Sequence, residues 1–404
     1  MPCAEAQGSL LKPVESRRNF DAWGDVRKMR VLFLGAGASK PASYPLAGEV
    51  MDTVEKALQD IPGSPTAQWE KWEEFRKRLP RKFRAVAYSQ NPEVILSFFD
   101  LLHLACQLED GRQRKMAIER TNLCSGIVDD GFRKWFRSSA RAEFFGGARV
   151  ALASFKDCLG WYFSFRHMED ESNRARRDYL RKRFAHLGNG DVVITLNWDT
   201  TAERTLAEEG RWNPSSGYGG IDKNLKLTGR GFPGNTFHSV PKDASIAPQI
   251  RVLKLHGSTG WYETRGALYF DERFLLHLPL DPLSMEKGLR WYDADRSSPF
   301  GNPPGELLLA YPSFLKQLSN PIINAIWREA GSVLGAADTV DIWGYSLPES
   351  DNAVRALLLA LVERTKLDQV EVCVHDPDKG TLERWDGFFE GSARLLPEPV
   401  EGNC

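Results

Sequence analysis

The sequence predicts an α/β protein in which a doubly wound, Rossmann-like parallel sheet carries a large inserted helical domain. Short apolar segments occur in both halves of the chain, and each ends in small or polar residues. Strand-like and helix-like segments alternate through the last third, as they do in βαβ units. Residues 61–187 instead show helical periodicity and little strand pattern. We therefore assign residues 1–60 and 188–404 to the sheet domain and residues 61–187 to the insertion.

The first strand is expected at residues 29–34, after a polar amino-terminal arm. Its run from Val31 to Leu34 is continuously apolar, which is typical of a strand covered on both faces. A loop then leads to a helix over residues 49–58, where Val50 and Val54 fall on one side.

The clearest helix of the insertion is expected at residues 93–102, because Asn91-Pro92 is a favourable helix start. Trp69 and Trp72 lie in a charged stretch, and we expect them in the core of the insertion. The basic stretch at 173–183 has helical spacing and acidic neighbours, which favours a solvated helix face over a nucleic-acid surface.

The rest of the sheet domain is predicted element by element. Strands are expected at residues 191–196, 251–255, 307–311, 339–344 and 370–375, and helices at 200–206, 320–336, 351–362 and 379–389. Residues 261–274 have the pattern of a hairpin. Residues 211–250 are rich in Gly, Pro, Asn and Ser, which indicates long loops or a small irregular subdomain, and 281–305 carries Pro, Gly and charge, which indicates another excursion of the chain. Thr200 and Asp351 are suited to cap the helices that follow them.

Composition and charge narrow the class of protein. The chain has 404 residues, 42% hydrophobic content and a formal net charge of −1, so it lacks the basic field that recruits nucleic acid, and any such contact would be indirect. No stretch is apolar over the ~20 residues of a membrane span, and the amino terminus lacks a secretory pattern. We therefore expect a cytoplasmic protein with no membrane contact. The six cysteines form no Cys-x-x-Cys pair, which argues against a zinc ribbon.

Small and polar residues at the predicted strand ends form the candidate site. They are Gly35, Ala36, Gly37 and Ser39 after the first strand, Asn197 and Asp199 after the second, His256 after the third, and Gly344, Ser346 and Asp376 after the later ones. Because the carboxyl ends of parallel strands share one edge of a sheet, we expect a single nucleotide cleft there. The glycine loop alone is a weak phosphate signal, since it lacks the third glycine of the dinucleotide fingerprint and the acidic residue that follows it.

These motifs occur in the order of the sirtuin motifs, and the wider sequence resembles the sirtuin-like NAD hydrolases of bacterial anti-phage defence. The resemblance rests on residues 195–203, 254–258, 311–316 and 344–351 and covers about 29–60 and 190–380. Protein-deacylating sirtuins carry a four-cysteine zinc module after the His-Gly strand, but here no cysteine lies between Cys158 and Cys373. Ser43-Tyr44-Pro45 also replaces their proline-phenylalanine-arginine run. We therefore expect no zinc, and an acyl-lysine groove would lack one wall.

The resemblance implies cleavage of the nicotinamide–ribose bond of NAD+, with nicotinamide and ADP-ribose as products. Asn197 and His256 would be catalytic: the amide would hold the ribose hydroxyls or a water, and the imidazole would accept a proton. Asp199 would contact the carboxamide of nicotinamide. The backbone of Gly35, Ala36, Gly37 and Ser39 would lie at the pyrophosphate, next to a helix amino terminus. Gly344, Ser346 and Asp376 would lie on the adenosine side.

Each of these residues also has a purely structural interpretation. Asn197 is a common turn residue, and Asp376 lies in a turn rich in Asp and Pro. His256 fits a buried histidine whose nitrogens are satisfied. Asp199 could cap the helix that begins near Thr200.

An unrestrained NAD hydrolase would deplete its host of the cofactor, so we expect an inactive basal state. Packing in a homo-oligomer, the helical insertion, or a protein partner such as an ATPase, an Argonaute-like protein or another sensor would set that state. Two other functions stay open. One is a regulatory module that binds NAD or ADP-ribose without turning it over. The other is an NAD-dependent ADP-ribosyltransferase or deacylase, which the missing cysteines disfavour.

Overall fold

The computed structural model describes most of the chain between residues 28 and 397. The described residues are 28–61, 64–79, 81–107, 112, 140–172, 177–214, 217–219, 221, 225–228, 237–239, 250–264, 267–271, 306–310, 320–349 and 351–397. The amino-terminal arm, the loop predicted at 281–305 and the motif at 311–316 lie outside them.

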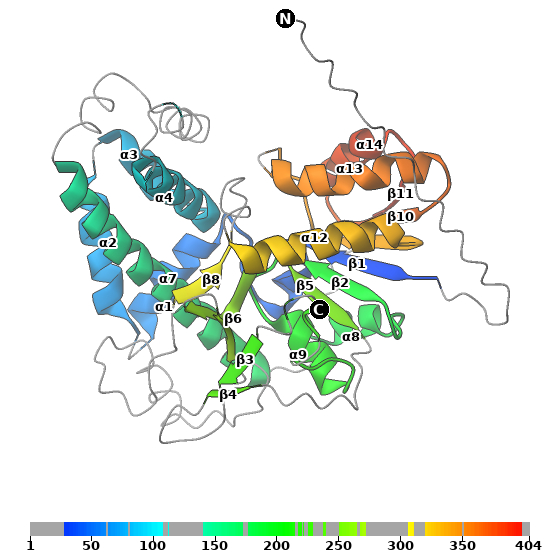
Figure 1. Ribbon diagram of the computed structural model, residues 1–404, viewed down its shortest axis with the longest axis horizontal. Helices are drawn as coiled ribbons and strands as arrows, with labels where there is room; N and C mark the ends of the chain where they lie inside the picture. The colour runs from blue at the N-terminus through cyan, green and yellow to red at the C-terminus, as the bar shows by residue number, and fades with distance from the viewer. Residues whose placement is uncertain are drawn as a thin grey trace, which may run out of the picture.

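The larger sheet among the described residues has six strands and is parallel throughout (Figure 1). Its strands are β1 (Arg30–Leu34), β2 (Val192–Thr195), β5 (Arg251–Lys254), β9 (Thr339–Trp343), β10 (Glu371–His375) and β11 (Arg394–Leu396). They lie in the order β11-β10-β9-β1-β2-β5, and every neighbouring pair is parallel. After β1, the chain adds β2 and β5 on one side of it. It then returns to the other side of β1 and adds β9, β10 and β11 outward from there. This is the strand order of a doubly wound, Rossmann-like sheet, and it confirms the predicted α/β class.

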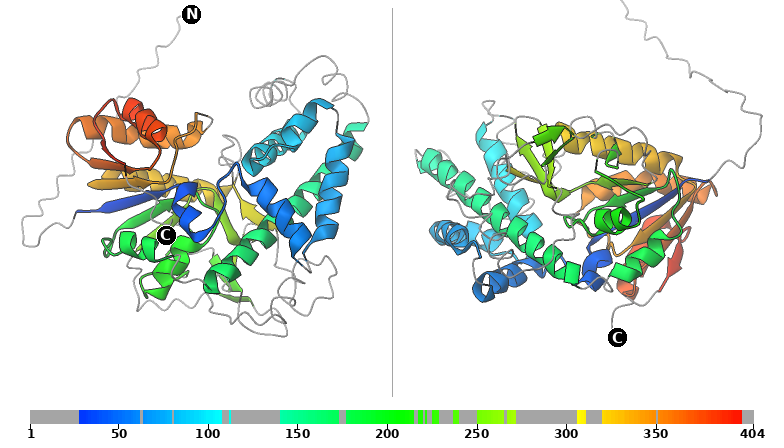
Figure 2. Two further views of the ribbon diagram at one scale, coloured as in Figure 1. Left: turned by 180° about the vertical axis from the view of Figure 1, so that it is seen from behind. Right: turned by 90° about the horizontal axis from the view of Figure 1, so that it is seen from below.

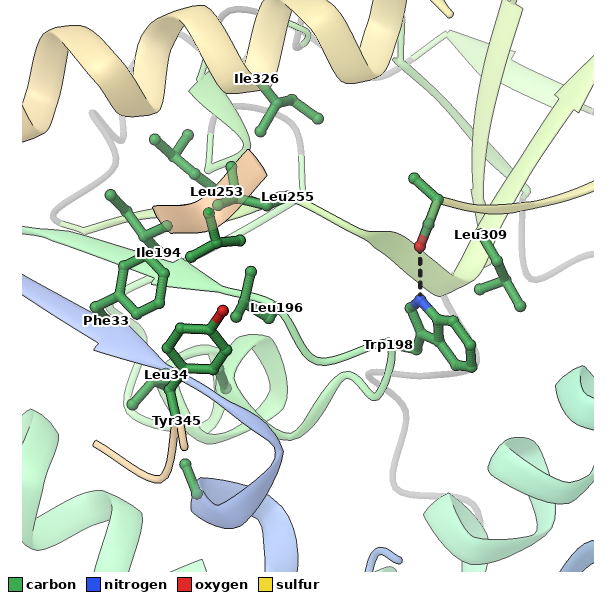
Figure 3. Close-up of a cluster of buried hydrophobic side chains, with 14 of the residues drawn as sticks. Phe33, Leu34, Ile194, Leu196, Trp198, Leu253, Leu255, Leu309, Ile326 and Tyr345 are labelled. Atoms are coloured by element: carbon green, nitrogen blue, oxygen red, sulfur yellow. Dashed lines mark hydrogen bonds between the residues drawn. The ribbon is translucent and has the colours of Figure 1, made fainter. Parts of the chain in front are cut away.

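Helices cover both faces of this sheet. The helices α12 (Pro321–Ala336), α13 (Asn352–Lys366) and α14 (Lys379–Phe389) lie on one face, and α8 (Asp178–Phe184) and α9 (Thr201–Glu208) lie on the other (Figures 1 and 2). The two directions of winding place these crossovers on opposite faces, because such connections are right-handed. The strands β1 and β2 are therefore buried almost throughout, as their continuous apolar runs indicated. Phe33, Ile194 and Leu253 form part of the resulting apolar core (Figure 3).

Side-chain caps set the starts of the later helices. The Asn320 side chain accepts hydrogen bonds from the amides of Ile322 and Ile323 at the start of α12, and Pro321 occupies the first helical position. Asp351 accepts from the amide of Val354 at the start of α13, as predicted.

Among the described residues, the chain between β1 and β2 is helical. It forms the 3₁₀ helix η1 (Ala36–Ala42) and the α-helices α1 (Val50–Asp60), α2 (Thr66–Arg78), α3 (Arg81–Ala87), α4 (Pro92–Gln107), α7 (Ala140–Ser172) and α8. In the views of Figures 1 and 2, α2, α3, α4 and α7 gather beside the parallel sheet. Trp69 and Trp72 are buried, as predicted, and Trp72 stacks on Phe155 at a centroid distance of 4.8 Å.

A second sheet is connected to the parallel sheet, since its longest strand begins at Gly257, shortly after β5 ends at Lys254. It contains β4 (Phe237–Ser239), β3 (Leu225–Thr228), β7 (Ala267–Asp271), β6 (Gly257–Thr264) and β8 (Glu306–Leu309), in that order. Strands β6 and β7 form the predicted hairpin. Residues 211–250 were expected to form long loops or a small irregular subdomain, and they contain β3 and β4. These strands were not predicted, because the local sequence does not reveal that β7 offers β3 a parallel partner.

Within the part of the chain that the structure describes, we find no helix that combines the length and the apolarity needed to cross a bilayer.

Candidate functional site

The predicted site residues follow the carboxyl ends of adjacent parallel strands. Leu34 of β1 pairs with Thr195 of β2 and with Trp343 of β9, and Thr195 pairs with Lys254 of β5. Gly35 and Gly344 therefore come one residue after paired positions on adjacent strands. Asn197 and His256 each come two residues after such positions, and Asp376 directly follows the end of β10. This edge, at the switch point between β1 and β9, is where doubly wound sheets bind their ligands.

Two strand ends meet through their glycines. The Gly37 amide donates to the Gly344 carbonyl oxygen at 2.8 Å. Gly344 has a φ of +65°, and a Cβ atom at this position would lie 2.2 Å from the nitrogen of Ala38. A Cβ atom on Gly35 would lie 2.5 Å from the Gly344 oxygen. The glycines thus allow the backbones of the two strand ends to touch.

This contact bears on the predicted role of the glycine loop. In this structure the Gly37 amide already donates to Gly344, so a pyrophosphate would have to compete with that bond. The loop from Ala36 onward is itself part of the short 3₁₀ helix η1, which contains Pro41, and α1 begins only at Val50. Ala36 and Ser346, which were also predicted to bind the dinucleotide, are exposed at this edge.

Asn197 is oriented by the glycine loop. Its Nδ2 donates to the hydroxyl of Ser39 at 2.9 Å, and its backbone amide donates to Oγ1 of Thr195 at 3.1 Å. The Oδ1 atom is buried and accepts no hydrogen bond from any described residue. An unsatisfied buried acceptor costs about 1–3 kcal/mol, so a ligand that donates to this oxygen would remove the penalty.

The loop that carries Asn197 is fixed from both sides. The carbonyl oxygen of Trp198 accepts from the amide and the hydroxyl of Thr259, at 2.9 and 3.0 Å. The Trp198 indole donates to the carbonyl oxygen of Ala310 at 3.0 Å, as the dashed line in Figure 3 marks. These contacts tie the end of β2 to the second sheet.

A buried ion pair between Lys254 and Glu203 supports the loop that carries Asn197. Lys254 donates to the carbonyl oxygen of Asp199, and its ammonium lies 3.1 Å from Oε1 of Glu203, with both side chains fully buried. The Tyr218 hydroxyl also donates to Glu203, at 3.1 Å. The partner charge offsets part of the cost of burial, but burial outweighs the attraction of Lys254 and raises the pKa of Glu203.

Asp199 has the structural role that was weighed against ligand binding. Its Oδ1 accepts from the amide of Thr201 at 2.9 Å, in the first turn of α9. Thr200 occupies the N-cap position, but its side chain makes no capping bond. The predicted cap position is therefore confirmed, but the Thr200 hydroxyl lies 3.3 Å from Nδ1 of His167 and does not bond to the helix amides. Asp376 likewise accepts from the amide of Asp378, which agrees with the interpretation of Asp376 as a turn residue.

His256 is buried at the end of β5, with 2% of its surface exposed. The ring stacks on Trp327 at a centroid distance of 6.5 Å, and Nδ1 lies 3.6 Å from Oε1 of Glu93 on α4. Neither ring nitrogen has a hydrogen-bond partner among the described residues. The imidazole is therefore almost closed to solvent in this structure.

Gly257 explains why a glycine follows this histidine. Its φ is +74°, and a Cβ atom there would lie 2.2 Å from the carbonyl oxygen of Leu308. The glycine therefore lets β8 approach the chain directly beside His256, whose carbonyl oxygen accepts from the amide of Ala310.

Acidic groups surround the imidazole. Burial alone would lower the pKa of His256, but the contact with Glu93 and the charge of Asp351 outweigh it and raise the pKa above its ordinary value. Asp351 is itself buried, and its Oδ2 accepts from the Tyr345 hydroxyl at 2.8 Å. The pKa of Asp351 is also raised, mainly by burial, and the nearby His256 lowers it by a smaller amount. The site can thus hold an imidazole that binds a proton readily.

Glu93 and Tyr345 were not predicted, and Asp351 was predicted only as a helix cap. A carboxylate in the first turn of a helix is a common stabilising feature, so no pattern in the sequence connected Glu93 with a histidine that follows a distant strand. The position of Tyr345, directly after Gly344 in the proposed cleft, was the one available signal.

The described residues contain no group of three His, Cys, Asp or Glu side chains that could hold a metal ion. Cys158 and Cys373 are buried free thiols. No protein-family model matches the chain, and no curated protein matches it.

Proposed function

We propose that the protein hydrolyses NAD+ at the nicotinamide–ribose bond, as an NAD-depleting effector of the sirtuin-like type in anti-phage defence. The observation that supports it most is the placement of Asn197 and His256. They come at equivalent positions after the adjacent strands β2 and β5, at the ligand-binding edge of a doubly wound sheet. Each also has a buried polar atom without a hydrogen-bond partner among the described residues.

The reaction assigns a task to each of these side chains. The bond between C1′ of the ribose and the nicotinamide nitrogen breaks, and its electron pair stays on that nitrogen. The oxygen of a water bonds to C1′, and His256 accepts a proton from this water and then releases it to solvent. Asn197 Oδ1 accepts a hydrogen bond from a ribose hydroxyl or from the water. The products are nicotinamide, ADP-ribose and one proton.

The remaining assignments follow the same proposal. The exposed Ala36 and Ser346 and the strand-end residues Gly35, Gly344 and Asp376 contact the pyrophosphate and the adenosine. Helices α2, α3, α4 and α7 form an inserted domain, and the buried state of His256 is the expected inactive state. A protein partner, or rearrangement of a homo-oligomer, converts this inactive state into the active one in the cytoplasm.

The test is release of nicotinamide and ADP-ribose by the purified full chain, alone and with the product of the adjacent gene, resolved by chromatography. We expect His256→Ala and Asn197→Ala to lower the rate by about 100- to 10,000-fold. His186→Ala removes an exposed histidine and serves as the matched control. Unchanged activity in either site variant would remove the assigned roles.

A module that binds NAD or ADP-ribose without turnover is the second candidate, and the burial of His256 favours it. Calorimetry separates the two functions. Tight binding with no nicotinamide released under any activating condition would establish the sensing module. Transfer of label from NAD to a protein acceptor would instead establish a transferase.

A further inference from the structure

The first turn of α4 meets the end of β5. Glu93 is the second residue of α4, and its amide donates to Oδ1 of Asn91 at 2.9 Å, which fixes the start of the helix. Its Oε1 lies 3.6 Å from Nδ1 of His256, and a quarter of its side chain is exposed. A carboxylate from the helices between β1 and β2 therefore reaches the imidazole at the end of β5.

We infer that Glu93 is a positioning residue for His256. The Glu93 carboxylate holds Nδ1 of the imidazole and leaves Nε2 of the same ring to accept the proton. This inference rests on the proposed NAD hydrolysis. A carboxylate at Nδ1 favours the tautomer that carries its proton there, so the lone pair lies on Nε2. It also stabilises the imidazolium that forms when the base accepts a proton.

The other groups around the imidazole ring already hydrogen-bond to other partners. Asp351, at the start of α13, accepts from the Tyr345 hydroxyl through Oδ2 and from the amide of Val354 through Oδ1. Trp327, from α12, stacks on the ring and donates its indole N–H to the carbonyl oxygen of Leu255. Among the described residues, Glu93 is the carboxylate that lies within ion-pair distance of His256 when the ring is protonated.

The position of α4 therefore sets the strength of the base. If α4 moved away, Nδ1 would lose the carboxylate, and the charge of Asp351 would remain as the acidic influence on the ring. Because the ring needs this carboxylate to act as the proposed base, the movement that admits NAD must leave the contact between Glu93 and His256 intact. The helices beside the sheet thus complete the site as well as covering it.

The first test measures the pKa of His256 in the full chain by NMR titration of labelled imidazole rings. The His256 signal is the one that disappears in His256→Gln. We expect Glu93→Gln to lower the His256 pKa, because the variant keeps the side-chain length but removes the charge. Glu93→Asp keeps the charge at a shorter reach and should lower the pKa less. Glu70→Gln removes an exposed carboxylate on α2 and should leave the pKa unchanged.

The second test measures kcat/KM for NAD against pH. In Glu93→Gln, the acid limb of the profile should move to lower pH together with the His256 pKa. The plateau should fall by no more than about 100-fold, since removal of the base itself costs about 100- to 10,000-fold.

An unchanged His256 pKa in folded Glu93→Gln overturns the inference, even if the wild type hydrolyses NAD. If Glu93→Gln does not fold, Glu93→Asp decides, and an unchanged pKa in that variant overturns the inference. Failure of the wild type to release nicotinamide under every activating condition overturns the proposed function instead. A lowered pKa in Glu93→Gln would still support the contact itself.

Discussion

The side-chain amide of Asn197 donates a hydrogen bond to the hydroxyl of Ser39, with 2.9 Å between Nδ2 and Oγ. The two residues are 158 positions apart and follow the adjacent strands β2 and β1. Ser39 is buried, so this bond is shielded from water. The glycine loop therefore orients the amide to which we assign the ribose.

The first prediction concerns this bond. Ser39→Ala should lower kcat for NAD hydrolysis about fivefold, the equivalent of a hydrogen bond worth ~1 kcal/mol, and should leave KM for NAD nearly unchanged. The reason is that the amide loses its orientation while the contacts of the dinucleotide remain. Steady-state kinetics give both constants.

A double-mutant cycle supplies the control. Ser39→Ala combined with Asn197→Ala should be no slower than Asn197→Ala alone, because Ser39 acts through Asn197. A raised KM with unchanged kcat in Ser39→Ala would instead assign Ser39 to the pyrophosphate.

The second prediction concerns the buried pair below the Asn197 loop. Lys254→Met leaves the fully buried Glu203 without its counter-ion, so the free energy of unfolding should fall by about 3–5 kcal/mol. Adding Glu203→Leu should recover much of the loss, since an apolar pair avoids the unpaired charge. Urea denaturation measures both effects.

Lys379→Met is the matched control, because Lys379 is almost fully exposed and its variant should unfold near the wild-type midpoint. Wild-type stability in Lys254→Met would show that the pair does not support the fold.

The third prediction concerns pH. Because the folded-state pKa of His256 is raised, the folded protein binds its proton more tightly than the unfolded chain does. The resulting stabilisation is complete below the unfolded pKa of about 6.5 and is lost as pH rises through the folded value. The stability advantage of the wild type over His256→Gln should therefore shrink across that window.

Chemical denaturation between about pH 5.5 and 8.5, a range around the ordinary histidine pKa, measures this dependence. An advantage that grows with pH would mean that the imidazole is neutral in the folded protein. Glu93→Gln should reduce the dependence, since it removes one of the two charges that raise the pKa.

The fourth prediction concerns the contact between the two strand ends. Gly344→Ala should destabilise the fold by more than about 1 kcal/mol, because alanine is strained at positive φ and its Cβ would meet the nitrogen of Ala38. Gly335→Ala, in α12 with open space around it, should instead stabilise by about 0.5–1 kcal/mol. Thermal unfolding compares the two, and equal melting temperatures would contradict the assigned contact.

The sequence predicted those elements whose signals are local. Asn320 and Asp351 marked helix starts to within a residue, and the apolar runs of β1, β2 and β5 located the inner strands. It did not predict β11, which has three residues and no fully buried position. It also could not assign β8 to the second sheet, because a strand carries no local mark of its partner.

The same division holds for the site. Topology alone places Asn197 and His256 at one edge, since parallel strands align their carboxyl ends. Whether the Gly37 amide is free depends on how closely β9 approaches β1, and the carboxylate at His256 depends on how α4 packs. Both are long-range contacts, which no spacing within a single segment encodes.

The pairing of β1 with β9 also bears on how the protein is made. The amide of Met29, just before β1, bonds to the carboxylate of Asp338, just before β9, across 309 residues. A nascent chain on the ribosome must therefore keep one side of its first strand unpaired until most of the protein has been synthesised. Products released early, before residue 339, would expose that strand to other chains and tend to self-associate.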